Sequence, residues 1–163
     1  MNEFPQTLKL VTVWLLIILA VWLGVQWFQW QRAQSRFEQF GGDIVLRRAP
    51  DGHFHWPATV HGVAVEFLVD TGATTTALPA AVAEAAGLVR GAPVRSSTAG
   101  GEVWGYESRA DLLLQGGLRV QRLRVTVLPD LASPLLGMDI LGRLHLTQRQ
   151  GELRIESAEP APR

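Results

Sequence analysis

The chain has no cysteine among its 163 residues. This absence excludes thiol catalysis, cysteine-based zinc sites and disulfides. It leaves the redox compartment open, because a chain without thiols suits either side of a membrane. A net charge is also missing, since 15 basic and 15 acidic residues cancel at pH 7. We therefore expect no nucleic acid among the partners, because binding to a phosphate backbone needs a basic excess.

Charged residues are absent from a long segment near the N-terminus. Residues 10–28 are almost entirely apolar, and Thr12 is the only polar side chain before Gln26. As a helix they would extend roughly 28 Å at 1.5 Å per residue, close to the hydrocarbon thickness of a bilayer. The segment predicts a transmembrane helix over residues 10–28, with the lipid bilayer as a partner. A cleaved signal peptide is the alternative, but the run is long for one.

The flanks of this segment differ by only one or two charges. Arg32 and Arg36 follow it, whereas Lys9 precedes it. The positive-inside rule therefore favours a cytoplasmic location for the C-terminal part, by a margin that leaves the side open.

Composition divides the remaining residues into four parts. Residues 1–9 form a short N-terminal tail, residues 29–42 a polar juxtamembrane linker, and residues 157–163 a disordered tail rich in proline and alanine. Residues 43–156 remain as the globular domain. A domain of this size can bury one modest hydrophobic core.

Strand patterns dominate this domain. Residues 53–60 and 63–69 are two runs joined by His61-Gly62, which indicates a hairpin. Residues 110–114 and 118–128 flank Gly116-Gly117 and predict a second hairpin. The apolar alternation of the later run changes phase near Gln121-Arg122, which indicates a β-bulge.

Four further segments complete the expected elements. Residues 79–87 begin with proline and end with glycine, a pattern typical of a short helix. Residues 138–144 suit a second short helix, and residues 145–155 a hairpin around Gln150-Gly151. Residues 96–106 are rich in glycine, serine and threonine and predict a mobile hairpin. The domain is therefore expected to be mostly β.

One carboxylate follows an apolar strand directly. The run Phe67-Leu68-Val69 is expected to be buried on both faces, and it ends in Asp70-Thr71-Gly72-Ala73. A turn built from aspartate and glycine is the simple structural explanation. An ionisable group at the end of a buried strand is costly, however, unless it takes part in chemistry.

A second apolar run, Leu135-Leu136-Gly137, follows about one small domain later. In this order, with the β pattern between them, the two motifs resemble the signature of retropepsin-like (clan AA) aspartic proteases. These are half-length relatives of pepsin that work as homodimers. The chain looks most similar to the bacterial, membrane-anchored type with one N-terminal helix. The resemblance implies a closed β-barrel half-domain with one or two short helices, in a single-pass protein of a bacterial inner membrane.

The resemblance also assigns roles to individual residues. It implies that Asp70 is catalytic, that the Thr71 hydroxyl bonds across the dimer axis, and that Gly72 lets the backbone approach the catalytic pair. It implies that Leu135, Leu136 and Gly137 pack against the active-site loop. The residues expected at the substrate are Ala73, Gly100, Gly101, Leu135, Leu136 and Gly137.

A single carboxylate cannot perform this chemistry, because an aspartic dyad needs one base and one acid. The chain contains one Asp-Thr-Gly, and Asp139 follows Leu136-Gly137 without a Thr/Ser-Gly after it. A twofold homodimer that pairs Asp70 with its symmetry mate solves this. The sequence therefore predicts a membrane-anchored aspartic endopeptidase acting on peptide or protein substrates, with no cofactor.

Other functions have weaker support. A metal site could use His53, His55 and His61, but no acidic residue stands at convincing ligand spacing. Serine catalysis lacks a Gly-x-Ser-x-Gly element. The remaining alternative is a non-enzymatic, membrane-tethered dimerisation or peptide-binding module on the same fold. The intact Asp70 favours the enzyme.

Overall fold

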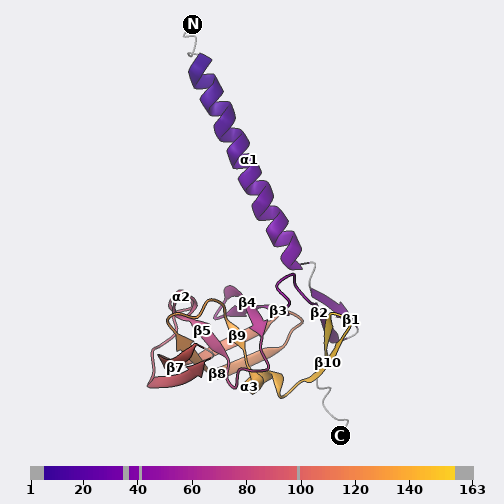
Figure 1. The fold of residues 1–163 in the computed structure, drawn as a ribbon, viewed down its shortest axis with the longest axis vertical. Coiled ribbons are helices and arrows are strands. Elements are labelled where there is room, and N and C mark those ends of the chain that lie inside the picture. Colours follow the sequence, from indigo (N-terminus) through magenta and orange to yellow (C-terminus); the bar gives the residue numbers. More distant parts are fainter. Residues whose placement is uncertain (1–5, 35–36, 41, 99, 157–163) are drawn as a thin grey trace. The chain divides into compact units, whose positions relative to one another are not determined.

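The computed structural model describes residues 6–34, 37–40, 42–98 and 100–156 (Figure 1). It divides the chain into two compact units, Met1–Ser35 and Arg36–Arg163. The expected C-terminal tail of residues 157–163, and residues 1–5 of the expected N-terminal tail, lie outside the described residues.

The first unit contains one helix, α1 (Gln6–Gln34), of 29 residues. A helix was expected here, over the shorter range of residues 10–28. Among the described residues, however, no helix combines the length and the apolar character that crossing a membrane requires. The expected transmembrane span is therefore not supported by the structure.

The second unit contains a four-stranded antiparallel sheet made from the two ends of the domain. Its order is β1-β2-β11-β10. The strands are β1 (Phe37–Phe40), β2 (Asp43–Arg47), β10 (His145–Arg149) and β11 (Glu152–Glu156). Residues 29–42, expected to be a linker, thus contain the end of α1 and the strand β1.

The larger sheet closes into a barrel. Its order is β3-β4-β9-β5-β8-β7-β6, and β3 also pairs with β7, so six strands form a ring and β6 extends it beyond β7. The strands are β3 (His55–Val60), β4 (Val63–Val69), β5 (Ala77–Pro79), β6 (Pro93–Thr98), β7 (Gly101–Leu114), β8 (Arg119–Leu128) and β9 (Leu135–Leu136). The short helices α2 (Ala80–Ala85) and α3 (Met138–Leu141) complete the domain. The predicted mostly β, closed-barrel fold is confirmed.

Local turn chemistry explains the hairpins. Both central residues of the β3–β4 turn have positive φ, 47° at His61 and 85° at Gly62. The β10–β11 turn repeats this with 49° at Gln150 and 82° at Gly151. Positive φ at both positions defines the two-residue turn whose twist matches that of paired strands. The expected bulge is confirmed as well, because the β7–β8 register shifts beside Arg122.

One hydrophobic core joins the two sheets. The inward side chains of the barrel include Trp56, Phe67 and Leu112, all buried, and Ile44 and Ile155 of the smaller sheet belong to the same cluster. The indole N–H of Trp56 donates to the Gln115 carbonyl at 2.8 Å, so its buried polar atom is paired. The smaller sheet therefore packs one face against the end of the barrel.

Two adjacent leucines of β7 give a matched test of this core. Leu112 is 1% exposed and Leu113 is 40% exposed. Leu112→Ala should lower the free energy of unfolding by about 2–5 kcal/mol because it leaves a cavity. Leu113→Ala should cost less than about 1 kcal/mol. Urea unfolding of the full chain, followed by circular dichroism, would measure both, and equal costs would contradict the inward placement of Leu112.

Candidate active site

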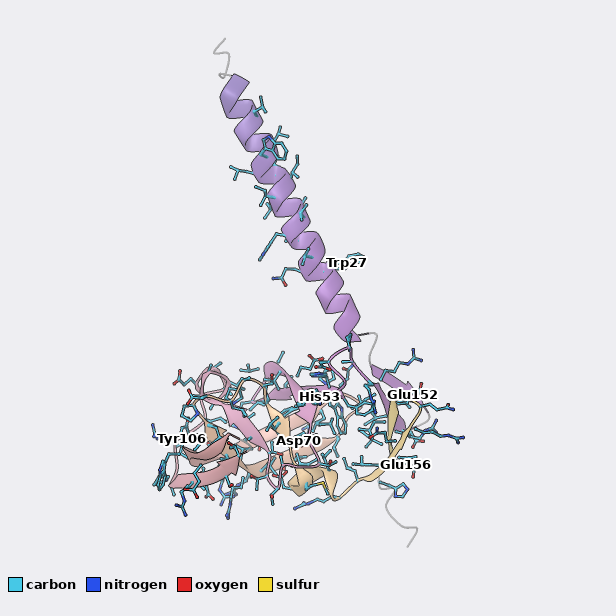
Figure 2. The ribbon with its side chains drawn as sticks, in the orientation of Figure 1. Trp27, His53, Asp70, Tyr106, Glu152 and Glu156 are labelled. Atoms are coloured by element: carbon cyan, nitrogen blue, oxygen red, sulfur yellow. The ribbon has the colours of Figure 1, made fainter. Side chains whose placement is uncertain are left out.

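Residues 70–76 form the loop that leads from β4 to β5, and they begin with the predicted catalytic carboxylate (Figure 2). The Asp70 Oδ1 atom accepts the Gly72 N–H at 2.8 Å, and the Asp70 carbonyl accepts the Ala73 N–H at 3.2 Å. This is a side-chain-stabilised turn, in which aspartate replaces a backbone acceptor. The turn itself therefore orients the carboxylate.

Exposure at this loop differs from the sequence expectation. Phe67 is fully buried, but Leu68 and Val69 are only half-buried, so the strand is not covered on both faces. Asp70 is half-buried, and Thr71 and Gly72 are exposed. The open side lies where β4 ends and the loop begins. The predicted catalytic triplet is thus accessible in a single copy of the chain.

Strand β9 brings the two sequence motifs together. It lies between β4 and β5, with Leu136 in parallel register with Val69. The Asp70 N–H donates to the Leu136 carbonyl at 3.1 Å, and the Met138 N–H donates to the Ala73 carbonyl at 2.8 Å. The apolar-apolar-glycine motif therefore lies directly against the Asp70 loop, 60 and more residues away in sequence.

Gly137 permits this close approach. A Cβ atom at this position would lie 2.5 Å from the Thr75 carbonyl carbon, 2.7 Å from its oxygen and 2.9 Å from the Thr76 nitrogen. Those atoms belong to the backbone of the Asp70 loop, so they cannot move aside cheaply. The φ angle of Gly137 is −94°, which any residue can adopt. The lack of room for a side chain is therefore the reason for a glycine at this position.

Sequence reasoning missed the role of Asp139, which it had considered only as a second catalytic aspartate. Its two carboxylate oxygens accept the N–H and the hydroxyl of Thr76, at 2.9 and 2.8 Å. The partners are 63 residues apart, and the pairing of β9 with β5 brings their segments together. No signal in the sequence indicated this pair, because the burial of Thr76 and its acceptor appear only in the folded chain.

The expected mobile hairpin is formed by β6 and β7. Gly100 and Gly101 lie at its tip, where the Thr98 hydroxyl donates to the Gly101 carbonyl at 2.8 Å. Further along β7, Trp104 is 66% exposed. These substrate candidates therefore belong to a separate element from the loop of Asp70 and Ala73.

The histidines do not gather at one point. The His55 Nε2 atom lies 2.6 Å from an Asp51 oxygen, whereas His61 lies in the β3–β4 turn. Hydrogen bonds from the His53 backbone and the His55 ring hold the pKa of Asp51 below its usual value. In the part of the chain that the structure describes, no three acidic or histidine side chains are grouped to hold a metal ion.

The end of β4, just before the Asp70 loop, is hydrogen-bonded to the segment that contains His53 and His55. The Val69 N–H donates to the Phe54 carbonyl at 2.9 Å, so the segment stabilised by Asp51 supports the end of β4. Asp51 therefore stabilises a segment that is hydrogen-bonded to the strand before the Asp70 loop.

The steric role of Gly137 can be tested with a matched glycine. Gly137→Ala should lower stability by about 1–3 kcal/mol and displace the Asp70 loop, because overpacking forces the backbone apart. Gly100→Ala should be nearly neutral for stability, since its nearest atom, the Thr98 hydroxyl, would be 3.7 Å away. Thermal unfolding of both variants would decide, and a neutral Gly137→Ala would contradict the close contact.

Comparisons with known proteins agree with this geometry. A family described as gag-polyprotein putative aspartyl protease matches residues 56–143, more than half of the chain. An uncharacterized Sinorhizobium protein from the cobV 5′ region is 29% identical over 94% of this chain and 75% of its own length. An uncharacterized Rickettsia prowazekii protein is 49% identical over 37 residues, 23% of this chain and 16% of its own.

A solved structure extends the likeness to the fold. The crystal structure of a retropepsin-like aspartic protease from Rickettsia conorii superposes with a TM-score of 0.56 at 25% identity, over 73% of this chain and 93% of its own. Together with the family match and the Asp70 loop, this likeness supports a peptidase. The chain belongs to the retropepsin-like aspartic protease family.

Proposed function

We propose that the protein is a membrane-anchored aspartic endopeptidase, whose catalytic pair is Asp70 of one copy and Asp70 of a second. One observation carries this proposal: the Asp70 carboxylate is held by the Gly72 N–H on an accessible loop that β9 fixes to the barrel. A rigid loop that leaves a carboxylate accessible is what a catalytic group needs.

The proposed chemistry requires two carboxylates about 3 Å apart, which share one proton because both cannot ionise at that distance. The ionised carboxylate removes a proton from a water molecule, whose oxygen attacks the peptide carbonyl. The protonated carboxylate gives its proton to the carbonyl oxygen. The ionised carboxylate then takes a proton back from one hydroxyl of the tetrahedral intermediate while the C–N bond breaks. The amine leaves with the proton that the other carboxylate took from water, and the pair again holds one proton.

A single copy supplies only half of this arrangement. Thr71 and Gly72 are exposed next to Asp70, so a second loop has room to approach. A cavity of about 440 Å³ lies on another part of the domain, lined by residues of β7, of β8, of the segment before β6 and of the β3–β4 turn. None of its lining residues is predicted for the peptidase site. In this proposal, the second copy completes the substrate cleft over Asp70.

The substrate would be an extended peptide. A β-sheet site can bind such a peptide by strand-like hydrogen bonding. The β6–β7 hairpin, with Gly100 and Gly101 at its tip and the exposed Trp104, is suited to close over it and exclude water. In this proposal, the half-buried Ala73 and Leu135 line the floor. Leu136, also expected at the substrate, is fully buried and belongs to the core.

The membrane anchor is the second part of the proposal. It rests on the exposed apolar surface of α1, since no helix among the described residues meets the requirements of a complete span. From Val13 to Trp27 every side chain of α1 is exposed, including Trp14 at 59%, Ile18 at 62% and Trp22 at 57%. Apolar side chains on all sides of a helix call for an apolar surrounding, which a bilayer provides. The proposed location is a bacterial inner membrane, and Arg32 and Arg36 favour a cytoplasmic domain.

Asp70→Asn should abolish proteolysis, by at least about a thousandfold, because loss of one member of a catalytic set costs that much in other hydrolases. Asparagine is nearly isosteric, so the fold should persist. Asp130→Asn, at an exposed aspartate outside the loop, is the matched control and should keep full activity. Mass spectrometry of a diverse peptide library, incubated with the full chain in detergent, would measure cleavage. Wild-type turnover by Asp70→Asn would instead favour a binding module.

The same variant tests the dimer. When equal amounts of wild-type and Asp70→Asn chains are mixed and allowed to exchange, roughly a quarter of random pairs carry both carboxylates. Activity at fixed total protein should then fall to roughly a quarter of the wild-type value. A fall to roughly half would show that each chain acts alone.

The anchor has its own test. The full chain should stay with membranes through a carbonate wash, and Leu16→Arg with Leu19→Arg should release it, since each charge costs about 3 kcal/mol within the bilayer. Release of the unaltered chain would refute the anchor. Digestion of the domain by protease added to intact spheroplasts would refute the cytoplasmic location.

A further inference from the structure

The loop that presents Asp70 is anchored at its far end by a carboxylate outside the catalytic pair. The Oδ2 atom of Asp139, in α3, accepts the Thr76 backbone N–H at 2.9 Å. Its Oδ1 atom accepts the Thr76 hydroxyl at 2.8 Å and the Ile140 N–H at 3.0 Å. Both oxygens of this half-buried side chain therefore receive donors, and two of the three come from Thr76.

Thr76 is the last residue of the loop and is fully buried. Its hydroxyl donates to Asp139 and accepts the Gly137 N–H at 3.3 Å. One hydroxyl thus connects the loop to two residues of the β9–α3 segment. Because unpaired polar groups are costly in a buried position, these bonds favour a single position of the loop end.

The two ends of the loop are coupled through its short length. Five residues separate Asp70 from Thr76, and the Ala73 carbonyl between them accepts the Met138 N–H at 2.8 Å. The Gly72 N–H that orients the Asp70 carboxylate lies within this stretch. The position of the Asp70 carboxylate therefore depends on both ends of the loop, one bonded to Leu136 and the other to Asp139.

We propose that Asp139 is a positioning residue, which acts through Thr76 to fix the loop that orients the Asp70 carboxylate toward the second copy. The inference rests on the proposed endopeptidase function. Asp139 does not contact the reacting atoms. Its carboxylate holds the loop in the conformation that two copies must share if their aspartates are to meet.

The sharpest variant is Asp139→Asn, which keeps size and shape. An asparagine offers one acceptor oxygen and one NH2 group. Whichever way the amide is turned, either the Thr76 N–H or the Ile140 N–H then faces a donor. Thr76→Val removes only the hydroxyl, and Thr76→Ser restores it.

Asp111→Asn is a matched control. The Asp111 Oδ1 atom accepts the Arg122 N–H at 2.6 Å, so this aspartate also binds a backbone donor, but at the β7–β8 bulge. Any general cost of losing such a bond should appear in this variant as well.

Peptide cleavage by the full chain in detergent gives the first measurement. Asp139→Asn and Thr76→Val should lower kcat by about 10- to 100-fold, since small displacements of catalytic groups have effects of this size. KM should change less than about twofold, and Thr76→Ser should recover most of kcat. Asp111→Asn should leave kcat unchanged. If Asp139 had a purely structural role, Asp139→Asn and Asp111→Asn would lose similar amounts of thermal stability. In that case kcat would not fall selectively in Asp139→Asn.

Hydrogen exchange gives a second measurement that does not need activity. The amides of residues 70–76 should exchange at least about tenfold faster in Asp139→Asn and Thr76→Val than in the wild type or Asp111→Asn. Unchanged exchange would overturn the positioning role, and so would faster exchange with an unaltered kcat. An inactive wild-type chain would overturn the proposed function, and the exchange rates alone would then decide whether Asp139 fixes the loop.

Discussion

The insertion of β9 between β4 and β5 is the contact on which the rest of the site depends. Two residues, Leu135 and Leu136, form a strand parallel to β4 and antiparallel to β5. Without them, the carboxyl end of β4 would have no neighbouring strand on the side that faces β5. The loop after β4 would then have no backbone segment to pack against. Their pairing joins β4, which ends just before Asp70, to β5, which begins after Thr76. It also seats the carbonyl of Leu136 as the acceptor for the Asp70 N–H.

This contact also determines which residues the loop can contain. A seven-residue turn must pair its backbone N–H and C=O groups, since few helical or sheet partners remain to it. Here aspartates accept two of the N–H groups, Asp70 for Gly72 and Asp139 for Thr76. The segment after β9 packs directly against the backbone of this loop, and only a glycine at position 137 leaves room for that contact. The motif residues are therefore explained by hydrogen bonding and space before any catalytic role is considered.

The sequence predicted what local chemistry determines. His61-Gly62 and Gln150-Gly151 specified their hairpins through positive φ, and the phase change at Arg122 revealed the bulge. The sequence did not predict features that depend on pairing between residues far apart in the chain. Strand β1 was read as linker, because its pairing with β2 leaves no periodic signal over four residues. The bond between Thr76 and Asp139 needs the barrel to be assembled first. The exposure of Leu68 and Val69 was missed because apolar composition does not reveal which neighbours a strand receives.

The proposed twofold symmetry requires rigidity in this loop and mobility in the hairpin. If two copies of one sequence supply the catalytic pair, any displacement of Asp70 occurs twice, so its effect on the distance between the two carboxylates is doubled. A loop bonded at Leu136, at Met138 and at Asp139 limits that error. In the proposed function the β6–β7 hairpin has the opposite requirement, because it has to open to admit a peptide and close again. Its exposed β6 edge and glycine tip suit that movement. The proposed catalysis thus requires a fixed loop and a mobile hairpin on the same barrel.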